Sequence, residues 1–233
     1  MRDLDDDSKN VSPTYRLGRW IIREDWPLWI LLFGSVIAAI LLYPTLPERF
    51  PGHWNVHGQV NAWMSRAAGA FGTLSVAFTI YGLMLLFPLV DPRRESYPKF
   101  HASYRVLRSL LVASMVALWG ISIAAAKGAR MRVDIAVPVV ISLLFIVLGN
   151  QMGRLRYNWF VGIRTPWSLA NETAWRMTHR TAAPVWVAGG FISLIGAFFG
   201  GTAAAVAMII GVGGAAIFSI AYSYYAFQRS KGA

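Results

Sequence analysis

Residues 149–180 read GNQMGRLRYNWFVGIRTPWSLANETAWRMTHR, a polar and aromatic stretch with hydrophobic sequence on both sides. It contains five arginines, three asparagines and a histidine among several tryptophans. The flanking segments 135–153 and 181–200 carry no Asp, Glu, Lys or Arg. Each is close to the roughly 20 apolar residues that a helix needs to cross a membrane. The stretch is therefore predicted to connect two membrane spans.

The same alternation of apolar and polar sequence continues through the chain. Further uncharged segments cover residues 26–43, 67–90, 109–126 and 202–227. Of the 233 residues, 56% are hydrophobic and 14% are charged, which is too apolar for an ordinary soluble domain. The uncharged run that begins at residue 181 is too long for one span, so the pair Gly200-Gly201 is predicted to turn the chain between two helices. The expected fold is an all-α membrane bundle with six transmembrane helices.

The distribution of basic residues predicts the orientation of this bundle. Of the 22 Lys and Arg residues, 17 fall on the side that holds both termini, the second connector and residues 149–180. The positive-inside rule places that side in the cytoplasm and accounts for the net charge of +11 without nucleic acid. Three basic residues in the third connector oppose this assignment and leave the inverted topology open. The expected parts are a cytoplasmic tail and interfacial segment at 1–25, a first helical hairpin at 26–90, and a four-helix region at 91–233.

Several classes of chemistry are disfavoured by the residues present. The chain has no cysteine, which excludes disulfides, zinc–thiolate sites and cysteine nucleophiles. It also has no Gly-x-Ser-x-Gly elbow and no glycine-rich phosphate loop. The uncharged segments hold no ionisable side chain other than tyrosine, which argues against an ion-coupled transporter but not against a passive channel. We expect no cofactor and no catalytic residues.

The first external connector, residues 44–66, is rich in histidine, tryptophan and proline. His53 and His57 are four residues apart, but a metal would need at least a third protein ligand. A folded turn at the membrane surface is the simpler interpretation, in which polar side chains bond to backbone and tryptophans act as interfacial anchors. The residues concerned are His53, Asn55 and Asn61, with Trp54 and Trp63.

The opening stretch supports two interpretations of its own. Thr165-Pro166 predicts a helix start, and the helix would continue to Arg180. On this helix Glu172 precedes Arg176 by four residues, and Trp175 and His179 share their face. The mixture of arginine and aromatic residues suits either an anchor at an anionic lipid surface or a surface that binds a partner.

The motifs in these two connectors resemble the SdpI-type family of bacterial membrane immunity proteins. The cytoplasmic pattern is Asn158-Trp159-Phe160-x-Gly162-Ile163-Arg164-Thr165-Pro166-Trp167-Ser168-Leu169-x-Asn171-Glu172, followed by Trp175-x-x-Thr178-His179-Arg180 and preceded by Gly149-Asn150-x-Met152. The external pattern resembles a short domain of unknown function that commonly precedes this signature. It reads Pro51-x-His53-Trp54-Asn55-x-x-Gly58-x-x-Asn61-x-Trp63-x-Ser65-Arg66. Asn61 stands where that pattern usually has Asp, and His57 is not part of it.

The resemblance implies a multi-span protein of the bacterial plasma membrane that protects its producer against a secreted peptide toxin. It further implies that a small DNA-binding repressor is held at the membrane when toxin is present. The toxin would meet the external residues His53, Trp54, Asn55, Gly58, Asn61 and Trp63. The repressor would meet the cytoplasmic residues Asn150, Asn158, Gly162, Arg164, Thr165, Trp167, Asn171, Glu172, Trp175, Arg176, Thr178, His179 and Arg180.

Two other functions remain open on the residues alone. Six spans with glycine-rich packing are compatible with a transporter or passive channel for a small molecule or lipid. A membrane enzyme could use Glu172 and His179 as acid–base groups, with Arg164 as a clamp.

Overall fold

Six helical segments in the described part of the chain, residues 23–231, are long and apolar enough to cross a membrane. The computed structural model places them at Trp26–Thr45, Arg66–Val90, Arg94–Ala126, Val133–Met152, Glu172–Phe199 and Gly201–Ser230. The prediction of six spans is confirmed, and the chain is a multi-pass membrane protein. Of the tail and interfacial segment expected at 1–25, residues 1–22 lie outside the described residues.

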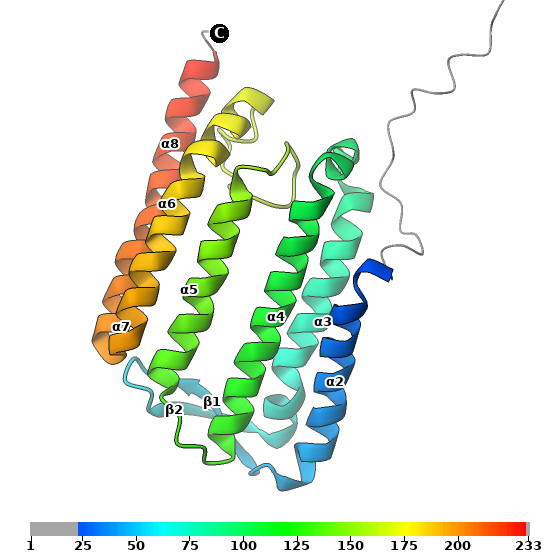
Figure 1. Cartoon of the computed structure of the whole chain (residues 1–233), viewed down its shortest axis with the longest axis vertical. Coiled ribbons are helices and arrows are strands. Elements are labelled where there is room, and N and C mark those ends of the chain that lie inside the picture. Colours follow the sequence, from blue (N-terminus) through cyan, green and yellow to red (C-terminus); the bar gives the residue numbers. More distant parts are fainter. Residues whose placement is uncertain (1–22, 232–233) are drawn as a thin grey trace, which may run out of the picture.

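The first three spans pack against one another (Figure 1). They are formed by α2 (Trp26–Leu42) with the 3-10 turn η2 (Tyr43–Thr45), α3 (Arg66–Val90), and α4 (His101–Ala126), which the 3-10 turn η3 (Arg94–Phe100) precedes. Leu32, Leu74 and Val112, one from each helix, are fully buried in their shared core. The Trp119 indole N–H donates to the carbonyl of Ala70 at 2.9 Å, which also joins α4 to α3.

The last three spans form the other side of the bundle in Figure 1. They are α5 (Val133–Met152), α6 (Glu172–Phe199), and a final span made of α7 (Gly201–Met208), a π-helical turn η4 (Ile209–Gly213) and α8 (Gly214–Ser230). The predicted turn at Gly200-Gly201 is confirmed, since both residues have positive φ, +67° and +54°. Gly189 and Gly211 bring α6 and η4 together so closely that a Cβ on either would overlap the other's backbone carbonyl.

The first connector, which was predicted to be external, contains a β-hairpin that the all-α expectation missed. Strands β1 (Arg49–Trp54) and β2 (Val60–Ser65) pair antiparallel, with register shifts on either side of His53. Phe50 is buried against Gly69 of α3, where any side chain at position 69 would overlap its ring. This aromatic side chain packs the hairpin against the bundle. Each strand is only six residues long, so the alternation that marks a strand was too short to stand out.

The two motif-rich connectors lie at opposite ends of the bundle (Figure 1). Residues 153–171, called here the signature loop, share one end with η3, the start of α2 and the end of α8. The β-hairpin lies at the other end, near the lower ends of α5 and α4 in this view. These are called the loop end and the hairpin end below.

Candidate functional site

An asparagine shapes the tip of the β-hairpin. The Asn55 side-chain oxygen accepts hydrogen bonds from the backbone N–H of His57 and of Gln59, both at 3.0 Å. Gly58 completes the turn with a φ of +75°, a conformation that glycine adopts without strain. The expectation that Asn55 bonds to backbone is confirmed.

The two other polar residues of the hairpin bond to each other rather than to backbone. His53 Nδ1 lies 2.6 Å from Asn61 Oδ1 across the strand pair, so the ring donates to the amide oxygen. His57 projects toward the α6–α7 turn instead, near Gly201. Within residues 23–231 no three His, Asp or Glu side chains are grouped as a metal site would require. Trp63 is half exposed, with the Arg49 guanidinium 5.5 Å from its ring.

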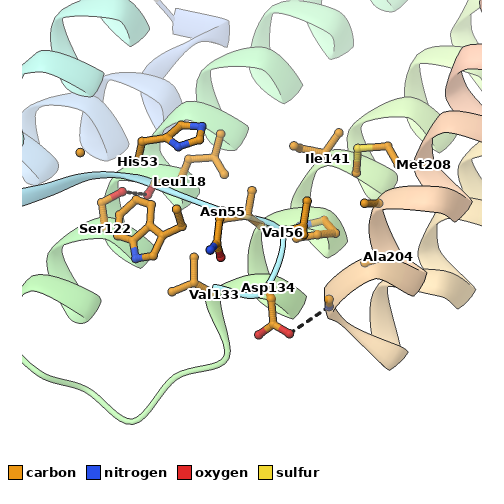
Figure 2. A pocket seen from close by; sticks show the side chains of 16 residues that line it. His53, Asn55, Val56, Leu118, Ser122, Val133, Asp134, Ile141, Ala204 and Met208 are labelled. Atoms are coloured by element: carbon orange, nitrogen blue, oxygen red, sulfur yellow. Dashed lines mark hydrogen bonds between the residues drawn. The ribbon is translucent and has the colours of Figure 1, made fainter. Parts of the chain in front are cut away.

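A cavity of about 660 Å³, called here the hairpin cavity, lies between the hairpin and helices α4, α5 and α7. Figure 2 shows His53, Asn55 and Val56 of the hairpin on one side and Ile141 and Met208 of the helices on the other. Most of its wall is apolar. Its volume is within the roughly 300–1,000 Å³ that is usual for ligand pockets.

One carboxylate at the edge of this cavity holds three segments together. Asp134, at the start of α5, accepts a hydrogen bond from the Gly201 backbone N–H at 3.0 Å (Figure 2). It also accepts from the Arg132 guanidinium at 2.6 Å. The bond to Asp134 raises the pKa of the Arg132 guanidinium above its ordinary value. The backbone of Gly58 lies against Asp134 as well, so the hairpin tip, α5 and the α6–α7 turn meet at this residue.

At the loop end, the signature loop is built around the fully buried Asn158. Its amide NH₂ donates to the carbonyls of Arg156 and Val161, and its oxygen accepts from the N–H of Phe160 and of Val161. Both halves of the amide are therefore used inside the loop. Asn158 is a structural centre of the motif and has no polar atom left for a partner.

Asp91, at the end of α3, ties the signature loop to the first three spans. This buried carboxylate accepts from the Tyr97 hydroxyl and from the backbone N–H of Trp159, both at 2.9 Å. Beside it the Arg93 guanidinium donates to the Tyr157 hydroxyl at 2.7 Å and lies 3.5 Å from the centre of that ring. Sequence reasoning assigned no role to Asp91. Its position directly after an uncharged span, followed by Pro92, was the available signal for a cap.

His179 fixes the signature loop to α6. Its Nε2 accepts the Ile163 backbone N–H at 2.8 Å, so the proton of a neutral ring resides on Nδ1, which donates to the Trp175 carbonyl at 2.9 Å. Trp175 stacks on the imidazole with ring centres 3.9 Å apart and donates to the Leu155 carbonyl. Gly162 has a φ of +126°, and a Cβ there would overlap His179. Both nitrogens of His179 are thus engaged in holding the loop.

The predicted helix start at Thr165-Pro166 is wrong. Thr165 and Ser168 form a local turn through reciprocal side-chain to backbone bonds of 3.0 Å. The helix begins six residues later, where the Asn171 side chain caps it by accepting the Ala174 N–H at 2.8 Å. Ser and Thr offer the backbone an alternative to helix, which here prevails over the preference of proline for a first turn.

The same segment contacts the last helix, α8. The hydroxyls of Thr165 and Ser223 are bonded at 2.8 Å, and Asn171 donates to the Ser230 hydroxyl at 3.0 Å. Trp167 meets Tyr224 edge to face, with ring centres 5.3 Å apart. The signature loop therefore joins α3, α6 and α8 at one end of the bundle.

The remaining predicted residues divide between the interior and the surface. Thr178 is buried and donates back to the Ala174 carbonyl at 2.7 Å. Of the face predicted on α6, Trp175 and His179 are buried while the other two side chains are exposed. The exposed set is Asn150, Arg164, Glu172, Arg176 and Arg180. Within the described residues no ion pair or hydrogen bond connects the side chains of Glu172, His179 and Arg164.

A buried ion pair among the first three spans was not predicted from the sequence. Arg108 of α4 and Asp25, the cap of α2, are each 1% exposed, and their side chains approach to 2.8 Å. The Tyr81 hydroxyl of α3 donates to the same carboxylate at 3.0 Å. Because α4 begins at His101, this arginine lies within a helix rather than in the preceding connector. The spacing gave a signal, since Tyr104 and Val112, four residues away on each side, are apolar and buried.

Comparison with known proteins agrees with these two motif regions. The SdpI/YfhL protein family matches residues 154–223, from the signature loop into α8. A second family, a domain of unknown function (DUF1648), matches residues 30–85, which contain the β-hairpin. The resemblance to the SdpI-type family, with its preceding domain, is thereby confirmed.

One curated relative covers most of the chain. The immunity protein SdpI of Bacillus subtilis (strain 168) is 28% identical over 203 residues, which is 87% of this chain and 95% of the relative. The chain is thus a homologue of an immunity protein over nearly the whole length of both. No solved structure matches.

Proposed function

We propose that this protein is a non-enzymatic immunity protein of the bacterial plasma membrane that protects its producer against a secreted peptide toxin. The observation that carries the proposal is the hairpin cavity. It lies beneath residues that match the external family motif, at the end of the bundle opposite the signature loop. Homology to an immunity protein over 203 residues supports the same function.

The proposed toxin site is the hairpin cavity, which is expected from the positive-inside rule to face the outside of the cell. Its apolar walls suit an apolar segment of a peptide. Asn55 and the His53–Asn61 pair hold the hairpin in a defined shape above it. A site that is formed before binding avoids the entropy of ordering a loop on contact.

Expression in a toxin-sensitive strain tests this proposal, with culture supernatant of the producing strain as the source of toxin. Val137→Trp fills the cavity from α5, and Leu143→Trp puts the same side chain on an exposed position of that helix. We expect the wild type and Leu143→Trp to protect and Val137→Trp to fail, at equal abundance in the membrane. Unchanged killing with the wild type present would refute immunity. Full protection by Val137→Trp would refute the cavity as the toxin site.

At the loop end, we propose that the exposed arginines hold a small DNA-binding repressor when toxin is bound. Arg176 and Arg180 project from the first turns of α6 and suit an acidic surface on such a partner. The charge reversal Arg176→Glu with Arg180→Glu should leave the repressor in the soluble fraction after toxin addition, with protection retained. A repressor that still moves to the membrane in this variant contradicts the assignment.

A further inference from the structure

A second cavity, of about 440 Å³ and called here the loop cavity, lies under the signature loop. Leu107 of α4, Phe145 and Met152 of α5 and Ala216 and Ile220 of α8 contribute its apolar walls. Residues 161–165 of the signature loop line it at the loop end. Phe145 and Met152 are seven residues apart on α5, which corresponds to a depth of about 10 Å along the helix axis.

Among the residues that the structure describes, Arg164 is the one charged residue in the wall of this cavity. Its side chain is exposed, and one guanidinium nitrogen donates to the Trp159 carbonyl at 3.1 Å. Among the described residues no carboxylate forms an ion pair with it. Because a guanidinium carries five N–H donors, most of its donors are available to an anion.

The hydroxyl groups of the wall are already engaged by protein. The Thr165 hydroxyl donates to Ser223 on α8. The Ser219 hydroxyl accepts from the Trp186 indole N–H at 2.9 Å and donates to the Ala215 carbonyl at 2.7 Å. The cavity therefore offers a ligand a cation at its rim and apolar surface within.

This arrangement matches an amphiphile that lies along the membrane normal. The rim is at the loop end, where half-exposed Trp159 marks the interface between lipid and water, and the apolar part extends into the hydrocarbon depth. A small water-soluble anion would gain nothing from contact with the apolar walls. A neutral lipid would leave Arg164 without an anionic partner. Arginine binds phosphate oxygens through paired hydrogen bonds.

We infer that the loop cavity binds one anionic phospholipid, with its head group on the Arg164 guanidinium and one acyl chain between α5 and α8. The lipid would fill the space between α4, α5 and α8 and would contact all three helices. This site is independent of the toxin site, which is at the other end of the bundle.

Lipid binding to the purified full chain in neutral detergent tests the inference. The probes are phosphatidylglycerol and phosphatidylcholine with identical acyl chains, measured by native mass spectrometry. We expect the wild type to prefer phosphatidylglycerol and Arg164→Gln to lower its affinity about fivefold, the effect of roughly 1 kcal/mol for one arginine at a lipid surface. Arg164→Lys should keep the preference for phosphatidylglycerol because it keeps the charge.

Two control variants distinguish binding in the loop cavity from a general attraction of anionic lipid to a basic protein. Arg176→Gln removes an exposed arginine that does not line the cavity and should leave the preference unchanged. Ala216→Trp fills the apolar part and should abolish retention of both lipids, while glycerol phosphate, which has no acyl chain, should not compete. Equal binding of the two lipids by the wild type, or equal losses in Arg164→Gln and Arg176→Gln, would overturn the inference.

Discussion

Replacing Gly162 by alanine should destabilise the protein through a single added methyl group. The φ of +126° at this position is one that residues with a Cβ rarely adopt, and the strain costs about 1–3 kcal/mol. The new Cβ would also displace His179, which accepts the Ile163 N–H. Leaving that donor unsatisfied costs about 1–3 kcal/mol more. The free energy of unfolding should therefore fall by about 2–6 kcal/mol.

Gly72→Ala in α3 is the matched control. A Cβ at Gly72 meets no atom within 4 Å, and alanine is favoured over glycine in a helix by about 0.5–1 kcal/mol. The same methyl group should thus act with opposite sign at the two positions. Unfolding by SDS in mixed micelles measures both. Equal unfolding free energies for the two variants would refute the assignment of Gly162 and His179 as the lock of the signature loop.

The remaining predictions concern the polar links of the bundle. Asp91→Ala removes the carboxylate that accepts from the Trp159 N–H and the Tyr97 hydroxyl, so the free energy of unfolding should fall by about 2 kcal/mol or more. The control Glu95→Ala removes an exposed carboxylate and should change it by no more than about 0.5 kcal/mol. Similar unfolding midpoints for the two variants would contradict the assignment of Asp91 as the link between α3 and the signature loop. Arg108→Leu alone should lower the free energy of unfolding by about 3–5 kcal/mol, because the buried Asp25 carboxylate then has no cation beside it. Adding Asp25→Leu should recover part of this loss. A double variant less stable than the single one would show that the pair itself stabilises the fold.

The spans and the Gly200-Gly201 turn could be predicted from the sequence because each depends on local composition. A membrane span needs only an uncharged length, and a turn between two spans needs residues that tolerate positive φ. The two motif regions were also predictable, since their density of polar and aromatic residues is unusual for membrane connectors. The opposite placement of these regions follows from the number of spans between them.

The contacts that organise the site could not be predicted, because they join residues far apart in the chain. Asp91 and Trp159 are 68 positions apart, and the local sequence around either residue does not indicate that they are in contact. The interpretation of Trp175 and His179 as part of one functional face rested on helical spacing, which does not distinguish a buried side from an exposed one. The late start of α6 depended on competition between two local signals, and the turn at Ser168 prevailed.

The buried pair of Asp25 and Arg108 sets an order on the assembly of the protein. The two residues are separated by 83 positions, so the first span is synthesised well before its partner arginine. Asp25 lies at the loop end of α2, where its carboxylate can remain hydrated during that interval. Arg108 on α4 supplies the charge that pairs with this carboxylate when it leaves water. The first three helices can therefore reach their native arrangement only after the third span has been synthesised.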